Sequence, residues 1–297
     1  MSHEVPADLL EIADALLPGA PLDRALLAAD GNIHHVVLLP GVAAVRIARR
    51  PSAAEALPRR TELLRAVAAA GLPFAVPEPL TPVSDFDGRT AVAVSWLDGA
   101  ALPEGEGDPE QIGELLRALR ETPLTPALRQ ALAGFPEQPP ARGWAHVLAD
   151  DVLPRLPARL RDEGRRRLDA ALALGPVPDA LVHGDLGGSN VLWGPDGKLT
   201  GVLDWDLALP FDPAVDAACM AWHGWDTVRE AVDHETYRRA RVWDRTFGIG
   251  HLIAVLPGRT LSNVDGYLDH IVPWLEHDAR EDGSGAAGAA GLTRPGP

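Results

Sequence analysis

One short segment of the chain, LVHGDLGGSNVLW, places oxygen-bearing and nitrogen-bearing side chains between apolar runs. His183, Asp185 and Asn190 lie in it, and Asp204 follows in GVLDWD, so the four residues fall within 22 positions. A carboxylate at Asp185 can accept a hydrogen bond from a hydroxyl group and direct its oxygen at a phosphorus atom. Asn190 and Asp204 offer the hard oxygen donors that magnesium prefers when it also binds phosphates. The segment therefore predicts phosphoryl transfer.

A different interpretation is that His183 binds a metal ion. It would be a zinc ligand, or part of a metal-dependent phosphoesterase built on His183 and Asp185. Such sites need further His or Cys ligands, and none follows at ligand spacing. We therefore expect His183 to pack under the loop and hold its backbone in place.

The elements that must position these residues follow from the apolar pattern. Short strands separated by turns at Asp30-Gly31-Asn32 and Pro40-Gly41, with further strands at 74–77 and 90–96, predict a small antiparallel sheet. A capping box of Ser52 and Glu55 is expected to begin a helix that Pro58 interrupts. Helices are expected at residues 7–17, 59–70, 109–121, 143–154, 157–174 and 213–279.

The length of 297 residues exceeds what one core usually needs, which predicts two lobes. We expect a nucleotide-binding lobe at 1–95, a hinge at 96–99, a helical lobe at 100–282 and a disordered tail at 283–297.

Acidic residues outnumber basic ones by 42 to 27, and residues 96–282 hold 31 acidic and 18 basic residues, a net charge of −13. This charge repels nucleic acid and anionic membranes and attracts cations, so neither nucleic acid nor membrane is an expected partner. The single cysteine, Cys219, excludes an internal disulfide, and neither a signal peptide nor a run of 18 apolar residues is recognisable. We expect a cytoplasmic protein that is a monomer or weak dimer.

The run HGDLGGSN, with LDWD and DPAVD downstream, resembles the aminoglycoside phosphotransferase family. The resemblance implies an α+β, bilobal protein-kinase-like fold with an antiparallel-sheet N-lobe and a mostly helical C-lobe. It also implies a magnesium-dependent O-phosphotransferase that uses ATP or GTP. Asp185 would be the catalytic aspartate, Asn190 and Asp204 would bind magnesium, and Asp216 would brace the catalytic loop. Asp212, before a proline, is expected to cap a helix.

The family pattern further implies a cation on the third strand, paired with a glutamate on the following helix. Lys198 is the only lysine, so Arg46 in VAAVRIA is expected to take this place. Glu62 is its expected partner, since capping already accounts for Glu55. An arginine between apolar neighbours needs such a partner unless the strand edge is exposed, which is the alternative.

The loop over the phosphates should be Gly31–His35, which has one glycine where protein kinases have three. The amides of Gly31 and Asn32 and the rings of His34 or His35 could contact phosphate, although the histidines could instead only form the turn into the strand. Gly184 stands where protein kinases carry an arginine that anchors a phosphorylated activation loop. By analogy with the fold, the nucleotide base should contact the hinge backbone at Ser95, Trp96 and Leu97.

Three longer runs are similar to family members that modify viomycin and capreomycin, which are strongly cationic peptides. The runs are GNIHHVVLL, ARR-x-x-A-A-E-x-L-P-R-R and VHGDLGGSNVLW, and the resemblance covers about residues 15–225. A cationic acceptor agrees with the acidic second lobe, where Asp226, Glu230 and Asp233 are the expected acceptor-binding residues. A kinase of a metabolite such as an amino alcohol or sugar, or a non-catalytic nucleotide-binding protein, remains an alternative. Tryptophans at 222–274 are expected to fill the core, or else to stack on the acceptor.

Overall fold

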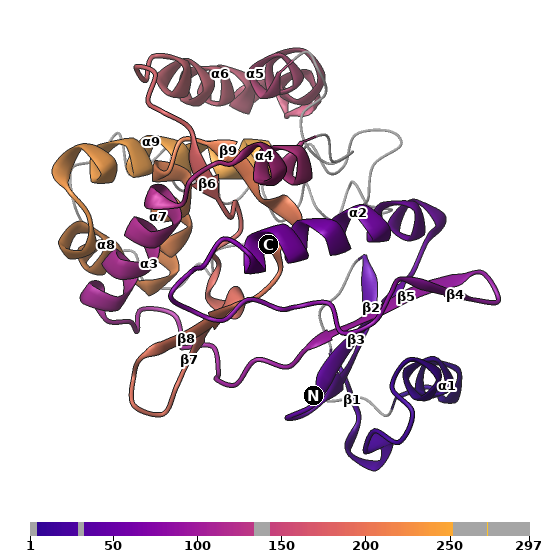
Figure 1. The fold of residues 1–297 in the computed structure, drawn as a ribbon. Coiled ribbons are helices and arrows are strands. Elements are labelled where there is room, and N and C mark those ends of the chain that lie inside the picture. Colours follow the sequence, from indigo (N-terminus) through magenta and orange to yellow (C-terminus); the bar gives the residue numbers. More distant parts are fainter. Residues whose placement is uncertain (1–4, 29–32, 134–142, 252–271, 273–297) are drawn as a thin grey trace.

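The computed structural model describes residues 5–28, 33–133, 143–251 and 272 of the chain. One part of the molecule, here called the N-lobe, is an antiparallel sheet flanked by α1 (Ala7–Leu16) and α2 (Pro51–Ala68) (Figure 1). The other part, the C-lobe, is mainly helical and holds two small two-stranded sheets. No helix in the described ranges is both long enough and apolar enough to cross a membrane.

Five strands form the N-lobe sheet in the order β1-β2-β3-β5-β4, and all neighbouring strands are antiparallel. Their bounds are Leu26–Leu27 (β1), His34–Leu39 (β2), Ala43–Ala48 (β3), Ser84–Phe86 (β4) and Arg89–Ser95 (β5). The sequence pattern missed β4, which pairs with β5 across the turn at Asp87 and Gly88. Both turn residues have positive φ, 51° and 86°, which is the backbone that Asp-Gly favours in tight hairpins.

Different helices cover the two faces of the sheet. Alternate apolar residues of β2 and β3 pack against α1, which buries Leu9, Ile12 and Ala13 as its sequence pattern predicts. Arg46 of β3 lies opposite Val92 of β5, and this second face packs against α2. Arg46 therefore points to the side of the sheet where the helix and the C-lobe lie.

The start and continuity of α2 differ from the prediction. The helix begins at Pro51, and no side chain caps it, so the Ser52–Glu55 capping box does not form. Proline suits the first helical position because its missing N–H would have no partner there. Pro58 lies within the helix on its exposed side, where water can bond the carbonyl group that loses its partner, and it does not interrupt the helix.

The described helices of the C-lobe are α3 (Pro109–Glu121), α4 (Pro126–Leu132), α5 (Trp144–His146), α6 (Ala158–Leu172), α7 (Ala214–Cys219), α8 (Trp225–Ala231) and α9 (His234–His251). The single helix expected over 143–154 is instead α5, a π-helical stretch at Val147–Val152 and a 3₁₀ turn at Leu153–Arg155. Pro154 has no N–H for an α-helical hydrogen bond, which explains the irregular continuation.

Two backbone pairings join the lobes. Ala100, just after β5, exchanges hydrogen bonds with Trp193 at 2.9 Å in both directions. Ala75 donates to Thr200 O at 3.0 Å and accepts from Val202 N at 2.9 Å. Ala75 lies in the segment 74–77, which was expected to be a strand but forms only this isolated bridge. Both pairings hold the N-lobe to the hairpin of β7 (Val191–Trp193) and β8 (Leu199–Val202).

Candidate active site

The loop after β6 (Ala180–Val182) brings Asp185 and Asn190 into contact. A 3₁₀ turn at Gly188–Asn190 directs the Asn190 amide back to the start of the loop. Its Nδ2 donates to the backbone O of Asp185 at 2.8 Å and to its Oδ2 at 3.0 Å. Because Oδ2 of Asp185 accepts this bond, Oδ1 is the oxygen that could accept from a further hydroxyl group.

Asp204 lies beside Asn190 because β7 and β8 pair there. Leu203 N donates to Asn190 O at 2.8 Å, and Asp204 is the next residue. Asp204 has a φ of 52°, a left-handed conformation that is strained for a residue with a side chain. Its side chain is 52% exposed, so the carboxylate reaches solvent although the loop around it is largely buried.

Asn190 and Asp204 fit a magnesium ion that is held jointly with phosphates. With Nδ2 of Asn190 bonded to Asp185, the amide oxygen on the other side of the same planar group can bind a cation. Among the residues that the structure describes, no three His, Cys, Asp or Glu side chains form a metal cluster. Magnesium does not need such a cluster, since one or two protein oxygens with substrate phosphates and water suffice.

His183 links the two loops of the site. It is fully buried, its Nε2 lies 2.8 Å from Leu203 O, and its Nδ1 accepts from Asp185 N at 3.2 Å. The Leu203 carbonyl can only accept, so Nε2 carries the proton. The Trp205 ring packs edge-on at 4.7 Å. These contacts are those expected of a residue that packs under the loop and holds its backbone.

One aspartate, Asp216, attaches this loop to α7, and another, Asp212, joins the start of α7 to α9. Asp216 of α7 accepts from His183 N at 2.8 Å and from Gly184 N at 2.9 Å, which is the contact expected of a brace. Asp212 accepts from Ala214 N at 3.0 Å, as a capping residue does. It also accepts from Arg239 and Trp243 of α9, at 2.5 and 2.6 Å, so it ties two helices together.

Gly184 has no room for a side chain. Its φ is 81°, and a Cβ atom there would lie 2.8 Å from Leu207 O. Both the backbone conformation and the neighbouring carbonyl therefore require glycine at this position.

Burial and the nearby Asp204 carboxylate raise the pKa of Asp185 to about 8, although the hydrogen bond from Asn190 opposes this. Without bound ligands, the carboxyl group therefore holds its proton near neutral pH. A cation placed next to Asp204 offsets the repulsion and favours the carboxylate form.

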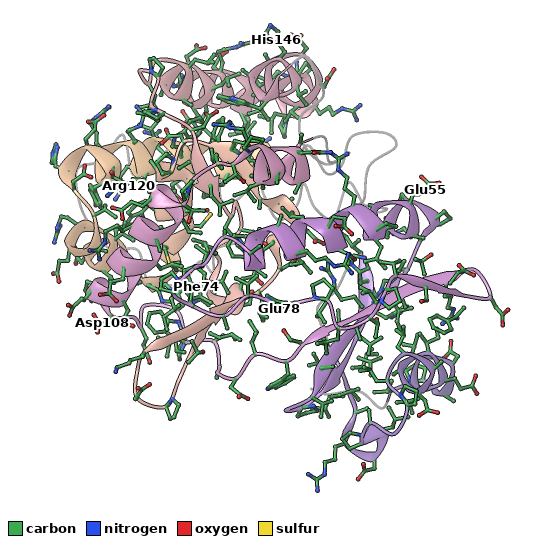
Figure 2. All side chains as sticks on the ribbon, viewed as in Figure 1. Glu55, Phe74, Glu78, Asp108, Arg120 and His146 are labelled. Carbon is green, nitrogen blue, oxygen red and sulfur yellow. The ribbon has the colours of Figure 1, made fainter. Side chains whose placement is uncertain are left out.

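The partner of Arg46 is not Glu62. Arg46 Nη2 donates to Asp206 Oδ2 at 2.5 Å and lies 4.0 Å from Asp204 Oδ1. Glu62 is 66% exposed and pairs with Arg65 on the outer side of α2. Glu55 is also exposed, near the N-terminal end of the helix (Figure 2). The helical period explains the error, because it turns position 62 outward and places Arg60, which is 1% exposed, on the buried side.

The two histidines of β2 point to opposite faces of the sheet. His34 is buried, and its Nδ1 lies 3.3 Å from Arg46 Nη2, on the face that meets the C-lobe. Burial and the Arg46 charge lower the pKa of His34 to about 3, so the ring is neutral. His35 lies near Arg89, which pairs with Asp8 of α1 at 2.5 Å. Because neighbouring strand residues alternate between faces, His35 points away from the face where a phosphate contact was expected. Gly31 and Asn32, the other expected contacts, lie outside the described residues.

The hinge backbone is partly engaged. Ser95 N donates to Glu78 O at 2.8 Å, and Ser95 Oγ accepts from Glu78 N at 2.9 Å. Trp96 donates through its indole to Asp98 at 2.9 Å. Since Ser95 is bonded to Glu78, the backbone of Trp96 and Leu97 is the part of the hinge that we still expect to contact a nucleotide base.

The expected acceptor-binding residues have other contacts. Asp226 is 84% exposed and pairs with Arg229 on α8 at 2.8 Å. Asp233 accepts from the N and Oγ1 of Thr236, at 2.9 and 2.8 Å, and thereby caps α9. Glu230 is exposed on α8. Nothing in these contacts connects the three to Asp185, and their role at an acceptor stays a prediction.

Two charged residues of the site, Arg60 and Asp206, are not predicted from the sequence, and for Trp222 the sequence predicts only a core or acceptor-stacking role. Arg60 falls on the stripe of buried residues that repeats every three to four positions along α2, and this period could have identified it. Asp206 repeats the carboxylate of Asp204 two residues later, which was the available signal. Trp222 packs against Gly188 of the catalytic loop, where a Cβ atom would lie 1.9 Å from its Nε1; no sequence signal indicates this contact. Trp243 is buried as predicted, whereas Trp222 and Trp225 are only half-buried and Trp274 lies outside the described residues.

Comparisons with known proteins establish the family and the fold. A sequence model of the phosphotransferase enzyme family matches residues 9–248. Viomycin phosphotransferase of Streptomyces vinaceus is 35% identical over 226 residues, 71% of this chain and 77% of that protein. The GDP complex of wild-type aminoglycoside 2'-phosphotransferase-IIIa has a TM-score of 0.76 at 18% identity and covers 94% of this chain and 100% of its own. A mutant aminoglycoside phosphotransferase bound to AMP-PNP and hygromycin B has a TM-score of 0.65 at 19% identity. The match covers 93% of this chain and 99% of that chain. The bilobal, kinase-like α+β fold is thereby confirmed.

Proposed function

Because this chain belongs to the phosphotransferase enzyme family, we propose that it transfers the γ-phosphate of ATP or GTP to a hydroxyl of a cationic antibiotic, specifically a cyclic peptide of the viomycin class. The observation that carries the proposal is the meeting of Asp185, Asn190 and Asp204 on one side of the site with Arg46 reaching them from the N-lobe. We place this activity in the cytoplasm, with the chain acting as a monomer or weak dimer.

The residues divide the chemistry between positioning and charge. Asp185 accepts a hydrogen bond from the acceptor hydroxyl through Oδ1 and takes up its proton as the oxygen–phosphorus bond forms. Asn190 fixes the rotamer of Asp185 through Oδ2. Arg46, which carries a permanent positive charge, binds phosphate oxygens and orients the nucleotide. Catalysis then rests on alignment of the reacting groups rather than on a strong base.

Asn190 and Asp204 would hold magnesium, which when bound neutralises phosphate charge and assists departure of the nucleoside diphosphate. The Asp204 side chain is 52% exposed, so this ion and the phosphates can reach its carboxylate from solvent. His183 and Asp216 keep the two loops in register while the ligands bind.

A cationic acceptor is supported by charge and by sequence similarity. Residues 96–282 carry a net charge of −13, which raises the local concentration of cationic molecules. The relative named viomycin phosphotransferase is 35% identical over most of its length. Modification of the antibiotic by this chain would protect the cell that makes the enzyme.

The experiment is a transfer assay with labelled ATP and GTP against viomycin, capreomycin, kanamycin, hygromycin B, an amino alcohol and a sugar. We expect label on viomycin or capreomycin and at least a hundredfold lower kcat for Asp185→Asn, with nucleotide affinity unchanged. Asp196→Asn, in an exposed turn between β7 and β8, is the matched control. Normal turnover by Asp185→Asn would refute its role. Label only on the amino alcohol or sugar would identify a metabolite kinase, and nucleotide binding without any transfer would identify a non-catalytic protein.

A further inference from the structure

Three charged side chains from three separate elements meet at one oxygen atom. Arg46 of β3 and Arg60 of α2 both donate to Oδ2 of Asp206, each at 2.5 Å. Asp206 lies in the 3₁₀ turn Trp205–Leu207 that follows Asp204. The side chains are 12%, 1% and 8% exposed, respectively, so the group, here called the arginine pair with Asp206, is nearly buried.

A carboxylate this close to Arg46 has two opposing effects on phosphate binding. It fixes the guanidinium in place, which favours binding by reducing the entropy lost when a phosphate arrives. It also cancels much of the positive charge that attracts the phosphate, and the cancellation is strong because the surroundings are poor in water. Arg60 donates to the same oxygen and offsets this second effect, since it places a second positive charge against the Asp206 carboxylate.

We propose that Arg60 and Asp206 are positioning residues for the nucleotide phosphates: Asp206 holds Arg46 in place, and Arg60 restores the positive charge that Asp206 would otherwise cancel. The inference rests on the proposed nucleotide-dependent function. Because Arg60 is only 1% exposed, its effect on a ligand must be indirect, and its contact with Asp206 is the route that the proposal uses.

The same contacts assign Asp206 to the arginines and not to the divalent ion. Its Oδ2 is occupied by two guanidinium groups, and its side chain is only 8% exposed. Asp204, only two residues earlier, differs from Asp206 in its exposure and in its distance from Arg46. It is 52% exposed and its Oδ1 lies 4.0 Å from Arg46. The two carboxylates of DWD thus have separate tasks, one toward the ion and one toward the cation of β3.

The first test measures the affinity of the full chain for MgATP without an acceptor, by isothermal titration calorimetry. We expect Arg60→Met to raise Kd about tenfold or more, because Asp206 then neutralises Arg46. Arg60→Lys should recover most of the affinity, since it returns the charge. Arg65→Met, which removes an exposed arginine from the same helix, should leave Kd unchanged and serves as the control.

The second test is a charge-balanced double variant, Arg60→Met with Asp206→Asn. Removing one charge of each sign leaves Arg46 with its full charge, so we expect Kd to return to within about threefold of wild type. A purely structural role for Arg60 predicts that Arg60→Met lowers Tm but leaves Kd unchanged. If Asp206 bound magnesium, the double variant would bind MgATP more weakly than Arg60→Met alone. Either result would overturn the inference.

A magnesium titration separates the two aspartates further. Asp204→Asn should raise the magnesium concentration needed for half-maximal transfer, whereas Asp206→Asn should change mainly the KM for the nucleotide. An equal magnesium shift in both variants would contradict the division of tasks. Failure of this inference is distinguishable from failure of the proposed function. If the wild-type protein does not bind MgATP, the proposed function itself is refuted, whatever the variants do.

Discussion

A methyl group added at Gly188 tests how tightly the catalytic loop is packed. A Cβ atom there would lie 1.9 Å from Nε1 of Trp222 and 2.3 Å from two carbons of the indole. Ordinary contacts need about 3.5 Å, so the ring or the loop must move by roughly 1.5 Å. Trp222 also donates to Leu102 O at 3.3 Å, which resists movement of the ring. We therefore expect the loop that carries Asp185, and not the Trp222 ring, to move.

The structure sets the size of this effect. Overpacking of this kind costs about 1–3 kcal/mol of unfolding free energy, which lowers Tm by roughly 2–10 °C in a protein of this size. A displacement of about 1 Å at reacting groups lowers the rate on the order of a hundredfold. The Gly188→Ala variant should therefore lose far more of its kcat than of its stability.

Calorimetric Tm and steady-state kcat/KM for phosphate transfer measure both effects. Trp222→Ala should suppress the defect of Gly188→Ala, with a coupling free energy of about 1–3 kcal/mol in the double-mutant cycle. Gly175→Ala is the control, because its added Cβ would meet no atom within 4 Å. Wild-type kcat and Tm in Gly188→Ala, or equal defects with and without Trp222, would refute the reasoning.

Three further predictions concern the supports of the site. Burial lowers the pKa of His183 to about 4. As pH falls below 6.5, the histidine is therefore protonated in the unfolded chain but stays neutral in the folded chain. On the order of 3 kcal/mol of stability is lost by pH 4, and urea unfolding of His183→Gln should show a flatter pH dependence. Arg239→Met leaves Asp212 without its buried cation and should cost about 3–5 kcal/mol in urea unfolding while the Kd for MgATP stays unchanged. Asp216→Asn loses one of two accepted N–H bonds, so kcat should fall about tenfold with unaltered nucleotide KM, and an unaltered kcat would exclude a bracing role.

Local signals predicted most of the fold. The turn at Pro40 and Gly41 and the apolar stripe of the first helix gave elements that the structure contains. Pro58 was misleading because a proline on the exposed side of a helix costs one hydrogen bond that water can replace. The Asp87-Gly88 pair, which forms the hairpin turn, is the sequence signal for β4.

The site was predictable where its residues are close in sequence. Asp185, Asn190 and Asp204 lie on one loop and the following hairpin, so spacing alone brought them together. The partner of Arg46 was not predictable in this way, because Asp206 is 160 residues distant along the chain. Pairing across the lobes depends on tertiary packing, which the helical period of α2 constrains but does not determine.

Gly184 has a consequence for how such an enzyme is governed. Because the backbone and Leu207 O exclude any side chain there, the arginine that lets a phosphate added elsewhere switch a protein kinase on cannot be accommodated. The catalytic loop is instead held in place by the permanent hydrogen bonds that its backbone N–H groups donate to Asp216. We expect a catalyst that is always on, whose output a cell adjusts by transcription and turnover of the protein.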